Sequence, residues 1–311
     1  MIKEWIDKVL DNISRVIVGK RDSIKLALIA LLCEGHILIE DIPGIGKTTF
    51  ARALARSVSC SFRRIQFTPD VLPSDIVGVY YFNQKTNDFE FRPGPIMANI
   101  VLADEINRAT PRTQSCLLEC MQEYQVTVEG VTRELPRPFM VIATQNPIEL
   151  EGTFPLPEAQ LDRFMMRVKL GYPSKEEEDI ILLRFQGCNP LDKLEPVLSI
   201  QQLLNLQRVC EKVYVEKSIR AYILDIVRAT RENPNIALGL SPRATLHLFK
   251  ACKALAAMEG RDYVIPDDVK FLATPVLAHR IILNTESQIK GKSKEDIINN
   301  IISVLSVPVE G

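Results

Sequence analysis

The sequence predicts an α/β domain with a parallel sheet sandwiched by helices, followed by an all-α domain. Three observations predict this fold. Short apolar strands alternate with helices up to about residue 172, a glycine-rich turn joins the first strand to a helix, and strand signals stop after Tyr172. Apolar strands separated by helices are typical of parallel sheets that are covered on both faces. We therefore expect the α/β domain at residues 1–172 and the helical domain at residues 173–311.

The predicted α/β domain begins with two helices, at residues 3–16 and 21–34. Apolar side chains on the first of them fall on one face, as in an amphipathic helix. The next helices are expected at residues 48–57 and 110–123, the latter opening with Pro111 near its first turn. Strands are expected at residues 36–40, 62–67, 99–103, 139–144 and 167–170.

Two segments of this domain break the alternation of strand and helix. Residues 79–92 alternate aromatic with polar side chains and contain a turn near Asn87-Asp88. Residues 125–137 alternate in the same way around Glu129-Gly130. Both patterns predict β-hairpins that project from the core as inserts.

The second domain is predicted from helix signals. Ser174, with Glu177 three residues later, forms a capping box that opens a helix. Further helices are expected at residues 203–213, 218–232, 242–259 and 267–279, with Gly260 as a helix stop.

Composition excludes several classes of protein. Apolar residues make up 46% of the chain, charged residues 25%, and the net charge is −1, so there is no overall basic excess of the kind that nucleic-acid proteins carry. The longest apolar run, Leu26–Cys33, is about half the length of a membrane helix. Charged residues near the start of the chain leave no signal peptide. The seven cysteines are scattered without a CxxC pair, which indicates reduced thiols and a cytoplasmic location.

A phosphate-binding site is expected where the first strand turns into the next helix. The glycines let backbone N–H groups surround phosphate oxygens, and the helix N-terminus adds partial positive charge. Lys47 would reach the β- and γ-phosphates, and the Thr48 hydroxyl would bind Mg²⁺. Asp41 stands where the full pattern has its first glycine, and we expect it to alter the turn rather than the phosphate cradle. The predicted nucleotide-binding residues are Pro43, Gly44, Ile45, Gly46, Lys47, Thr48 and Thr49.

Polar side chains follow two of the other strands. Asp104 and Glu105 end the strand at 99–103, at the edge where open α/β sheets bind ligands. Asp104 could hold Mg²⁺ through water, and Glu105 could polarise the attacking water as a general base. Asn146 follows the next strand and could bind the γ-phosphate or this water, although taken by itself a turn residue before Pro147 is the simpler explanation.

In this order the residues resemble AAA+ ATPases, and most closely the MoxR branch. The resemblance covers about residues 15–172 strongly and the second domain less specifically. The matching segments are Gln66–Asp70, Pro73–Gly78, Phe91–Pro95, Ala103–Ala109, Ala143–Pro147, Gly152–Phe164 and Gly239–Ala244. The two hairpins resemble the helix 2 insert and the pre-sensor 1 insert of this branch, and the second domain resembles its lid.

The resemblance implies roles for individual residues. Asn146 matches sensor 1, and Val18 and Gly19 match the segment against the adenine. Arg163 matches the arginine finger that reaches the nucleotide of the neighbouring subunit, and Arg243 matches sensor 2, which touches the phosphates of its own subunit. A simple alternative for Arg163 is an ion pair with Glu158 or Asp162.

The resemblance also implies the activity: hydrolysis of ATP with Mg²⁺ by a homo-oligomeric ring, expected to be hexameric. A guanidinium supplied by the neighbour stabilises charge on the transferred phosphoryl group and makes hydrolysis depend on assembly. The implied partners are protein clients, including von Willebrand factor A domain proteins, whose complexes the ring would remodel or mature.

Two alternatives use the same ATPase core. One is a nucleic-acid translocase, but the second hairpin carries Glu129 and Glu134 beside Arg133 and Arg137, which makes a poor electrostatic path for a phosphate backbone. The other is a metal-chelatase motor subunit, and no feature of the sequence clearly distinguishes it from a ring that remodels protein complexes.

Overall fold

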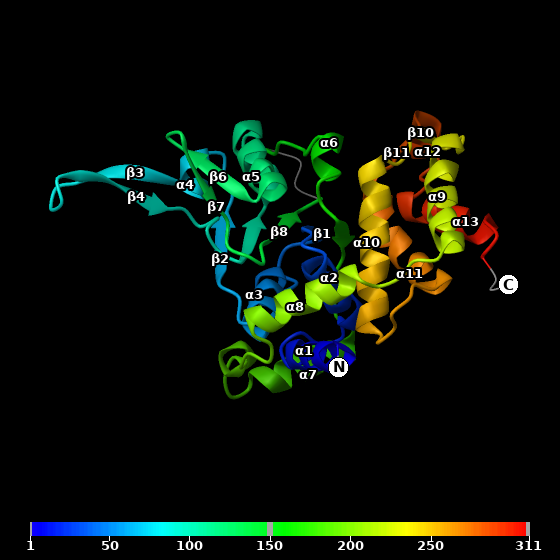
Figure 1. Ribbon diagram of the computed structural model, residues 1–311, viewed down its shortest axis with the longest axis horizontal. Helices are drawn as coiled ribbons and strands as arrows, with labels where there is room; N and C mark the ends of the chain where they lie inside the picture. The colour runs from blue at the N-terminus through cyan, green and yellow to red at the C-terminus, as the bar shows by residue number, and fades with distance from the viewer. Residues whose placement is uncertain (1, 148–151, 309–311) are drawn as a thin grey trace.

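The computed structural model describes residues 2–147 and 152–308. Its first domain contains a five-stranded sheet in which every pairing is parallel. The strand order is β2 (Phe62–Gln66), β5 (Ile100–Asp104), β8 (Met140–Gln145), β1 (Ile37–Glu40) and β9 (Met166–Val168). The five strands expected from the sequence are therefore confirmed, and their carboxyl ends lie at one edge of the sheet (Figure 1).

Successive side chains of the central strands enter two different hydrophobic clusters. Ile100 and Leu102 pack in a cluster with Phe50 of α3 (Lys47–Ser57), whereas Val101 and Ala103 pack with Leu117 of α5 (Pro111–Glu123). Side chains of a strand point alternately to opposite faces, so this division shows that helices cover both faces of the sheet. The other helices of this domain are α1 (Ile2–Ser14), α2 (Arg21–Leu32), α4 (Pro73–Val77), α6 (Glu158–Leu161) and the 3₁₀ turn η1 (Ile106–Arg108).

Both predicted hairpins are present. The first pairs β3 (Gly78–Asn83) with β4 (Asp88–Pro93), and the second pairs β6 (Gln125–Val128) with β7 (Val131–Glu134). The first projects far from the sheet (Figure 1).

One side chain joins the two hairpins. The Arg133 guanidinium donates to the Tyr80 hydroxyl at 2.6 Å and lies 4.0 Å from the centre of the Phe91 ring. Such a cation–π contact, with a hydrogen bond beside it, holds the base of the first hairpin against the second.

The second domain is mainly helical, and several of its helices pack against α10. Its helices are α7 (Lys175–Phe185), α8 (Ile200–Glu211), α9 (Lys217–Glu232), α10 (Pro242–Met258), α11 (Pro266–Leu277), α12 (Thr285–Ile289) and α13 (Lys294–Val304), with 3₁₀ turns η2 (Pro190–Lys193) and η3 (Ala278–Arg280). The capping box at Ser174 is present. The sequence did not predict a two-stranded antiparallel sheet, β10 (Ile236–Leu238) with β11 (Ile282–Leu283), so strands do not stop at Tyr172.

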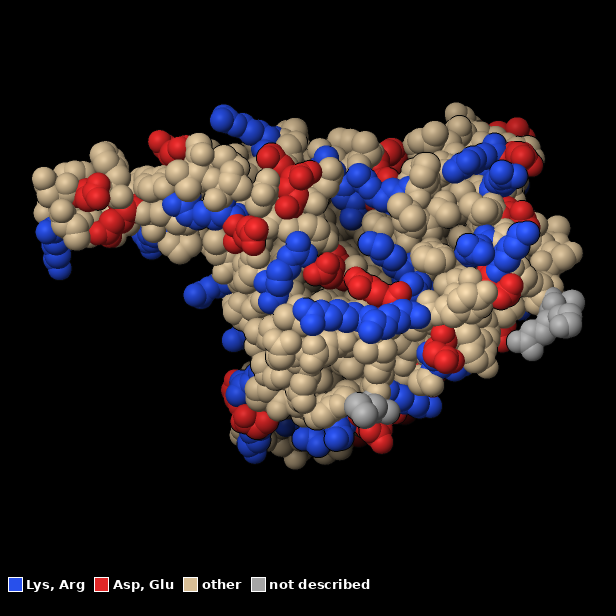
Figure 2. Space-filling model, in the orientation of Figure 1, with Lys and Arg blue, Asp and Glu red and all other residues tan. Residues whose placement is uncertain are grey.

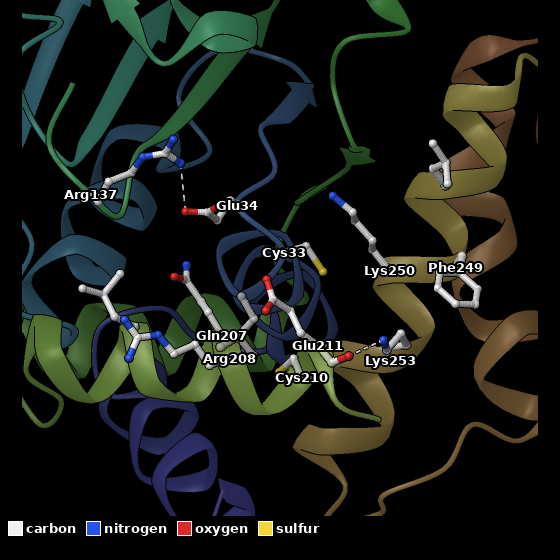
Figure 3. Close-up of a pocket in the computed structure, with 13 residues that line it drawn as sticks. Cys33, Glu34, Arg137, Gln207, Arg208, Cys210, Glu211, Phe249, Lys250 and Lys253 are labelled. Atoms are coloured by element: carbon white, nitrogen blue, oxygen red, sulfur yellow. Dashed lines mark hydrogen bonds and ion pairs between the residues drawn. The ribbon is translucent and has the colours of Figure 1, made fainter. Parts of the chain in front are cut away.

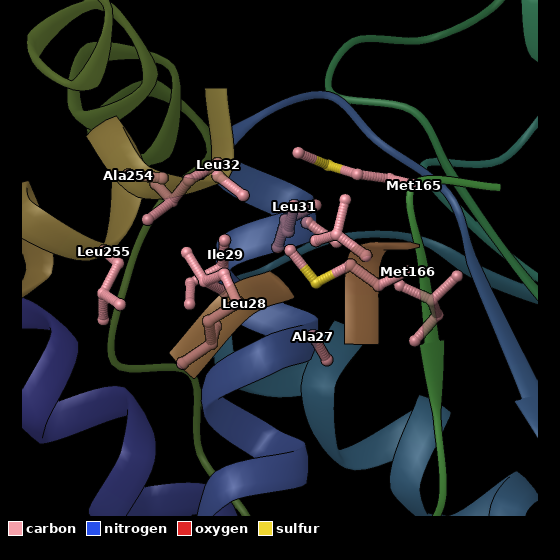
Figure 4. Packing of buried hydrophobic residues seen from close by; sticks show 14 of the residues in the cluster. Ala27, Leu28, Ile29, Leu31, Leu32, Met165, Met166, Ala254 and Leu255 are labelled. Carbon is pink, nitrogen blue, oxygen red and sulfur yellow. The ribbon is translucent and has the colours of Figure 1, made fainter. Parts of the chain in front are cut away.

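The core is continuous between the two domains. Leu31 and Leu32 of α2 lie in one cluster with Met166 of β9 and Ala254 of α10 (Figure 4). The boundary between residues 172 and 173 therefore stays a prediction. Among the helices formed by the described residues, we find none with the length and apolar character needed to cross a bilayer.

Candidate active site

The glycine-rich turn adopts a backbone conformation that favours glycine. Gly44 and Gly46 have φ angles of 85° and 88°, in the left-handed region. A Cβ on either residue would meet no atom within 4 Å, so backbone conformation rather than crowding selects glycine here. Gly46 is the N-cap residue of α3. Among the described residues, no side chain caps the N-terminus of this helix. The first N–H groups of α3 are thus available to an anion.

Lys47 lies at the start of α3 and points back across the turn. Its ammonium donates to the backbone oxygen of Asp41 at 2.5 Å. Burial lowers its pKa, while Asp104, Asp41 and Glu105 act in the opposite direction. Because the ammonium is held by a carbonyl oxygen, it is well placed to exchange this partner for phosphate oxygens.

Asp41 ties the entrance of the turn to the end of the sheet. One carboxylate oxygen accepts from the backbone N–H groups of Leu170 and Gly171, both at 2.7 Å, and the other accepts from Ile42 at 3.0 Å. The side chain therefore acts on the loop from outside and leaves the turn at Gly44 and Gly46 in place. The expectation that Asp41 alters the turn rather than the phosphate cradle stays a prediction.

Asp104 ends β5 and is held by two neighbours. One oxygen accepts from Arg64 Nε at 3.0 Å and Nη2 at 2.6 Å, and the other accepts from the Thr144 hydroxyl at 2.6 Å. Arg64 is a site residue that the sequence did not predict. The sequence of its strand, β2, has no feature that indicates a functional residue. Arg64 reaches Asp104 because β2 pairs with β5.

Glu105 stands in a strained position just beyond the strand. Its φ is 59°, which is uncommon for a residue other than glycine and frequent at functional sites. Its N–H donates to the Thr144 hydroxyl at 2.8 Å. Its carboxylate accepts from Gln66 Nε2 at 2.9 Å and forms an ion pair with Arg108 at 3.1 Å. These contacts hold the carboxylate at the end of β5, where Glu105 lines a cavity.

These groups surround one cavity of about 400 Å³. Asn146, whose exposed fraction is 7%, reaches it from the end of β8. Ile45 does not line it and packs on the hydrophobic core instead. The described lining residues are Pro43, Gly44, Gly46, Lys47, Thr48, Thr49, Arg64, Asp104, Glu105 and Asn146.

The lining fits a magnesium ion beside a polyphosphate. A hydroxyl oxygen from Thr48 and a carboxylate from Asp104 are the hard oxygen ligands that Mg²⁺ prefers when phosphates supply the rest. The Arg64 guanidinium pairs with Asp104 Oδ2, so it would compete with a metal ion for that oxygen.

The two predicted arginines lie elsewhere, in a second cavity of about 160 Å³. Arg163 and Arg243 line it together with His36 and His247. Neither arginine is among the described residues that line the cavity of their own P-loop. The resemblance implies that Arg243 touches the phosphates of its own subunit, and this role stays a prediction; in the structure Arg243 lines a cavity with Arg163.

Asp162 contacts Arg243, Arg280 and Ser241 but does not pair with Arg163. Its carboxylate accepts from Arg280 Nε at 3.0 Å and from the Ser241 hydroxyl at 3.0 and 3.1 Å, and lies 3.6 Å from Arg243 Nη1. Within the described residues no ion pair engages Arg163, so the expected alternative of a pair with Glu158 or Asp162 is not formed.

The predicted adenine segment contacts α7. Gly19 has a φ of 72°, and a Cβ there would lie 1.6 Å from Glu177 Oε1. Lys20 next to it pairs with Glu177 at 3.4 Å. Val18 is buried, and neither Val18 nor Gly19 lines the P-loop cavity in the described chain.

Comparison with known proteins gives consistent matches. A sequence model of the ATPase family associated with various cellular activities (AAA) matches residues 36–166, and one of the AAA lid domain matches residues 228–301. The chain is 52% identical to the protein YeaC of Bacillus subtilis, covering 98% of this chain and 95% of that protein. It is 41% identical to Chaperone MoxR1 of Mycobacterium tuberculosis, covering 97% of this chain and 82% of that one.

A solved structure agrees over the whole chain. The crystal structure described as a putative ATPase from Cytophaga hutchinsonii superposes with a TM-score of 0.92 at 41% identity, covering 99% of this chain and 96% of that one. The agreement extends through both domains, including the one that carries Arg243.

Proposed function

The chain belongs to the MoxR family of AAA+ ATPases, and we propose that it hydrolyses ATP as one subunit of a closed homo-oligomeric ring that remodels or matures protein complexes. One observation carries the ring. The chain holds the phosphate loop and its acids in one cavity, and both candidate arginines in another. A complete site then needs two copies, arranged head to tail, and such contacts form a ring when their rotation closes.

Within one copy the P-loop cavity supplies binding and the base. Lys47 and the N-terminus of α3 would hold the β- and γ-phosphates, and Thr48 and Asp104 would hold Mg²⁺. When bound, this ion neutralises charge on the phosphate oxygens. Glu105 accepts a proton from the attacking water as the phosphorus–oxygen bond to ADP breaks, and Asn146 orients that water.

The neighbouring copy supplies the positive charge that completes the site. Arg163 and Arg243 line one cavity, and Asp162, next to Arg163 in the chain, pairs with Arg243, so we propose that both arginines reach the nucleotide of the adjacent subunit. This changes the role implied for Arg243, which the resemblance assigned to its own subunit. An arginine supplied in this way contributes about 10³–10⁵ in rate in GTPases.

Mixing two inactive variants tests the shared site. Lys47→Ala lacks a functional P-loop but keeps its arginines, and Arg163→Ala has the opposite defect. Each alone should be inactive, and an equal mixture should recover about one quarter of wild-type activity if copies assort at random in a head-to-tail ring.

A matched mixture provides the control. Lys47→Ala mixed with Glu105→Gln should recover nothing, because both changes lie in the same half-site. Co-assembly of the first pair without recovered ATPase activity would contradict a site shared between copies.

For the partner class we propose proteins, including von Willebrand factor A domain proteins, handled by an expected hexamer in the reducing cytoplasm. The family name of a relative, Chaperone MoxR1, supports protein clients. The seven free thiols fit a reducing compartment. Arg133, a cation of the second hairpin, is engaged by Tyr80 and Phe91 and so is not presented to a phosphate backbone. DNA should therefore leave the ATPase rate unchanged.

A further inference from the structure

Helix α7 (Lys175–Phe185) buries none of its side chains in its own chain. The other described helices of eleven or more residues each bury several. One edge of α7 is anchored: Arg184 donates to the backbone oxygens of Ser14 and Arg15 at 2.6 and 2.7 Å, and Glu177 pairs with Lys20. The rest of the helix faces outward.

The outward surface of α7 is apolar at one end and acidic at the other. Four apolar residues are well exposed in its second half: Ile180 at 40%, Leu182 at 68%, Leu183 at 56% and Phe185 at 50%. Three exposed acids, Glu176, Glu178 and Asp179, precede them. A cluster of large apolar side chains with a charged border is typical of a contact surface.

A groove in which basic residues outnumber acidic ones lies between α8 and α10, beside the end of α2 (Figure 3). Its volume is about 750 Å³. Figure 2 shows the same face of the molecule, hollowed at its middle and bordered by basic and acidic side chains. The groove is lined by the apolar residues Leu32, Leu204, Leu246 and Phe249, by the basic residues Arg137, Arg208, Lys250 and Lys253, and by the acids Glu34 and Glu211.

The basic side of the groove is open to a partner. Arg137 is paired with Glu34 at 2.9 Å, and Lys253 donates to a backbone oxygen of Glu211. Arg208 and Lys250 form no ion pair with any described residue. Their charges are therefore available to carboxylates from outside the chain.

The groove continues from the cavity of the two arginines. Glu34 lines both. Arg243, His247 and Lys250 follow one another on α10 at helical spacing, so they share one face. At a rise of 1.5 Å per residue, Arg243 and Lys253 are about 15 Å apart along the helix.

The half of the proposed site that contains the P-loop also has a contact surface beside it, helix α7. The P-loop is tied through Asp41 to Leu170 and Gly171, directly before α7, and Glu177 of α7 abuts Gly19. In the copy that binds the phosphates, α7 lies beside the P-loop. In the neighbouring copy that supplies the arginines, the groove lies beside those arginines.

We propose that α7 of one copy docks into the α8–α10 groove of the next copy in the ring. Glu178 and Asp179 then face Arg208 and Lys250, and the apolar half of α7 packs on Leu246 and Phe249. This inference rests on the proposed ring and names a contact that would hold it together outside the nucleotide site. Charge complementarity selects a second copy as the occupant.

A charge exchange tests the contact, with Glu105→Gln as the parent because we expect it to retain ATP. One variant carries Glu178→Lys and Asp179→Lys, a second carries Arg208→Glu and Lys250→Glu, and a third carries all four changes. Sedimentation velocity with ATP gives the protein concentration at half-assembly. Each reversed pair should raise it by about tenfold or more, and the combined variant should return it to within about threefold of the parent.

Controls separate this contact from general effects of charge. Asp225→Lys, an exposed acid of α9 outside both cavities, should assemble as the parent does. All the altered side chains are exposed, so the melting temperature of each variant should match the parent.

Two results would overturn the docking. In the first, each charge-reversed variant assembles at the same protein concentration as the parent. In the second, the variant with all four changes assembles no better than the variants with two changes. If the wild-type ring forms and its ATPase activity depends on Arg163, either result removes only the docking of α7. A wild-type chain that stays monomeric in ATP would remove the proposed ring as well.

Discussion

Arg280 Nε donates to the carboxylate of Asp162 at 3.0 Å, immediately before Arg163 in the chain. The Arg280 side chain is 2% exposed, and burial lowers its pKa to about 10, so it remains charged at neutral pH. It also donates to the backbone oxygen of Met165 at 3.3 Å and to His247 Nδ1. This one guanidinium thus fixes the segment that carries Arg163 against the helix that carries Arg243.

Arg280→Lys should lower ATP turnover by about tenfold, while the Kd of the monomer for ATP stays within about twofold. Lysine keeps the charge but cannot hold the forked set of contacts, so Arg163 and Arg243 lose their fixed spacing. Steady-state ATPase rates and nucleotide titration measure the two quantities.

Arg261→Lys is the matched control for Arg280→Lys. Arg261 forms a forked pair with Asp268 at 2.6 and 2.8 Å, outside both cavities. It should lower stability without a comparable loss of turnover. An equal loss in both variants would show that Arg280 acts only through stability.

Glu105→Gln should bind ATP with wild-type affinity and hydrolyse it at least about 10²-fold more slowly. The amide keeps the shape and the contact with Gln66 but cannot accept a proton from water. Single-turnover hydrolysis separates binding from chemistry. Wild-type turnover in this variant would remove Glu105 as the base.

Arg64→Ala should lower the Mg²⁺ concentration needed for tight ATP binding by about fivefold, equivalent to about 1 kcal/mol. Arg64 is 46% exposed and pairs with Asp104, so its removal frees a carboxylate oxygen for the metal ion at small cost elsewhere. Titration of Mg²⁺ at fixed nucleotide measures the change.

Arg63→Ala, one residue earlier and also exposed, is the control for Arg64 and should leave the Mg²⁺ dependence unchanged. Weaker magnesium-dependent binding in Arg64→Ala would instead make Arg64 a ligand-binding residue rather than a competitor of the metal ion.

His36 should make stability depend on pH. Burial lowers its pKa from 6.5 to about 4. Its Nδ1 accepts from the N–H of Val141 at 3.0 Å and its Nε2 donates to the backbone oxygen of Met121 at 2.9 Å, which requires the neutral ring. Because the unfolded chain binds a proton more readily, the free energy of unfolding falls as pH decreases from about 6.5 to 4, by about 3 kcal/mol.

Urea unfolding at several pH values measures this effect of His36. His36→Gln can keep both hydrogen bonds without titrating, so its stability should fall less steeply between pH 6.5 and 4 than that of the wild type. Parallel curves for the two proteins would contradict a neutral, buried His36.

The sequence predicted those parts of the site that are local in the chain. The P-loop could be recognised because its strand, turn and helix are contiguous. Arg64 could not, because its role depends on β2 lying beside β5, and a strand's own pattern does not reveal its neighbour. The same limit applies to β10 and β11, two short segments far apart in the chain that pair only in the folded domain.

The placement of the two arginines shows a related limit. The resemblance assigned Arg163 to a neighbour's nucleotide and Arg243 to its own. Their shared cavity depends on Arg280 and Ser241, which bring two domains together around Asp162. Local patterns carry no information about such packing between domains.

The contact between Arg133 and the base of the long hairpin has a mechanical consequence. The second hairpin leads directly into β8, the strand that ends at the nucleotide cavity with Asn146. Because Arg133 fastens the two hairpins, we expect any shift of β8 to move both hairpins together. The first hairpin's strands are six residues long, or about 20 Å, so a small rotation at its base would move its tip over a larger distance.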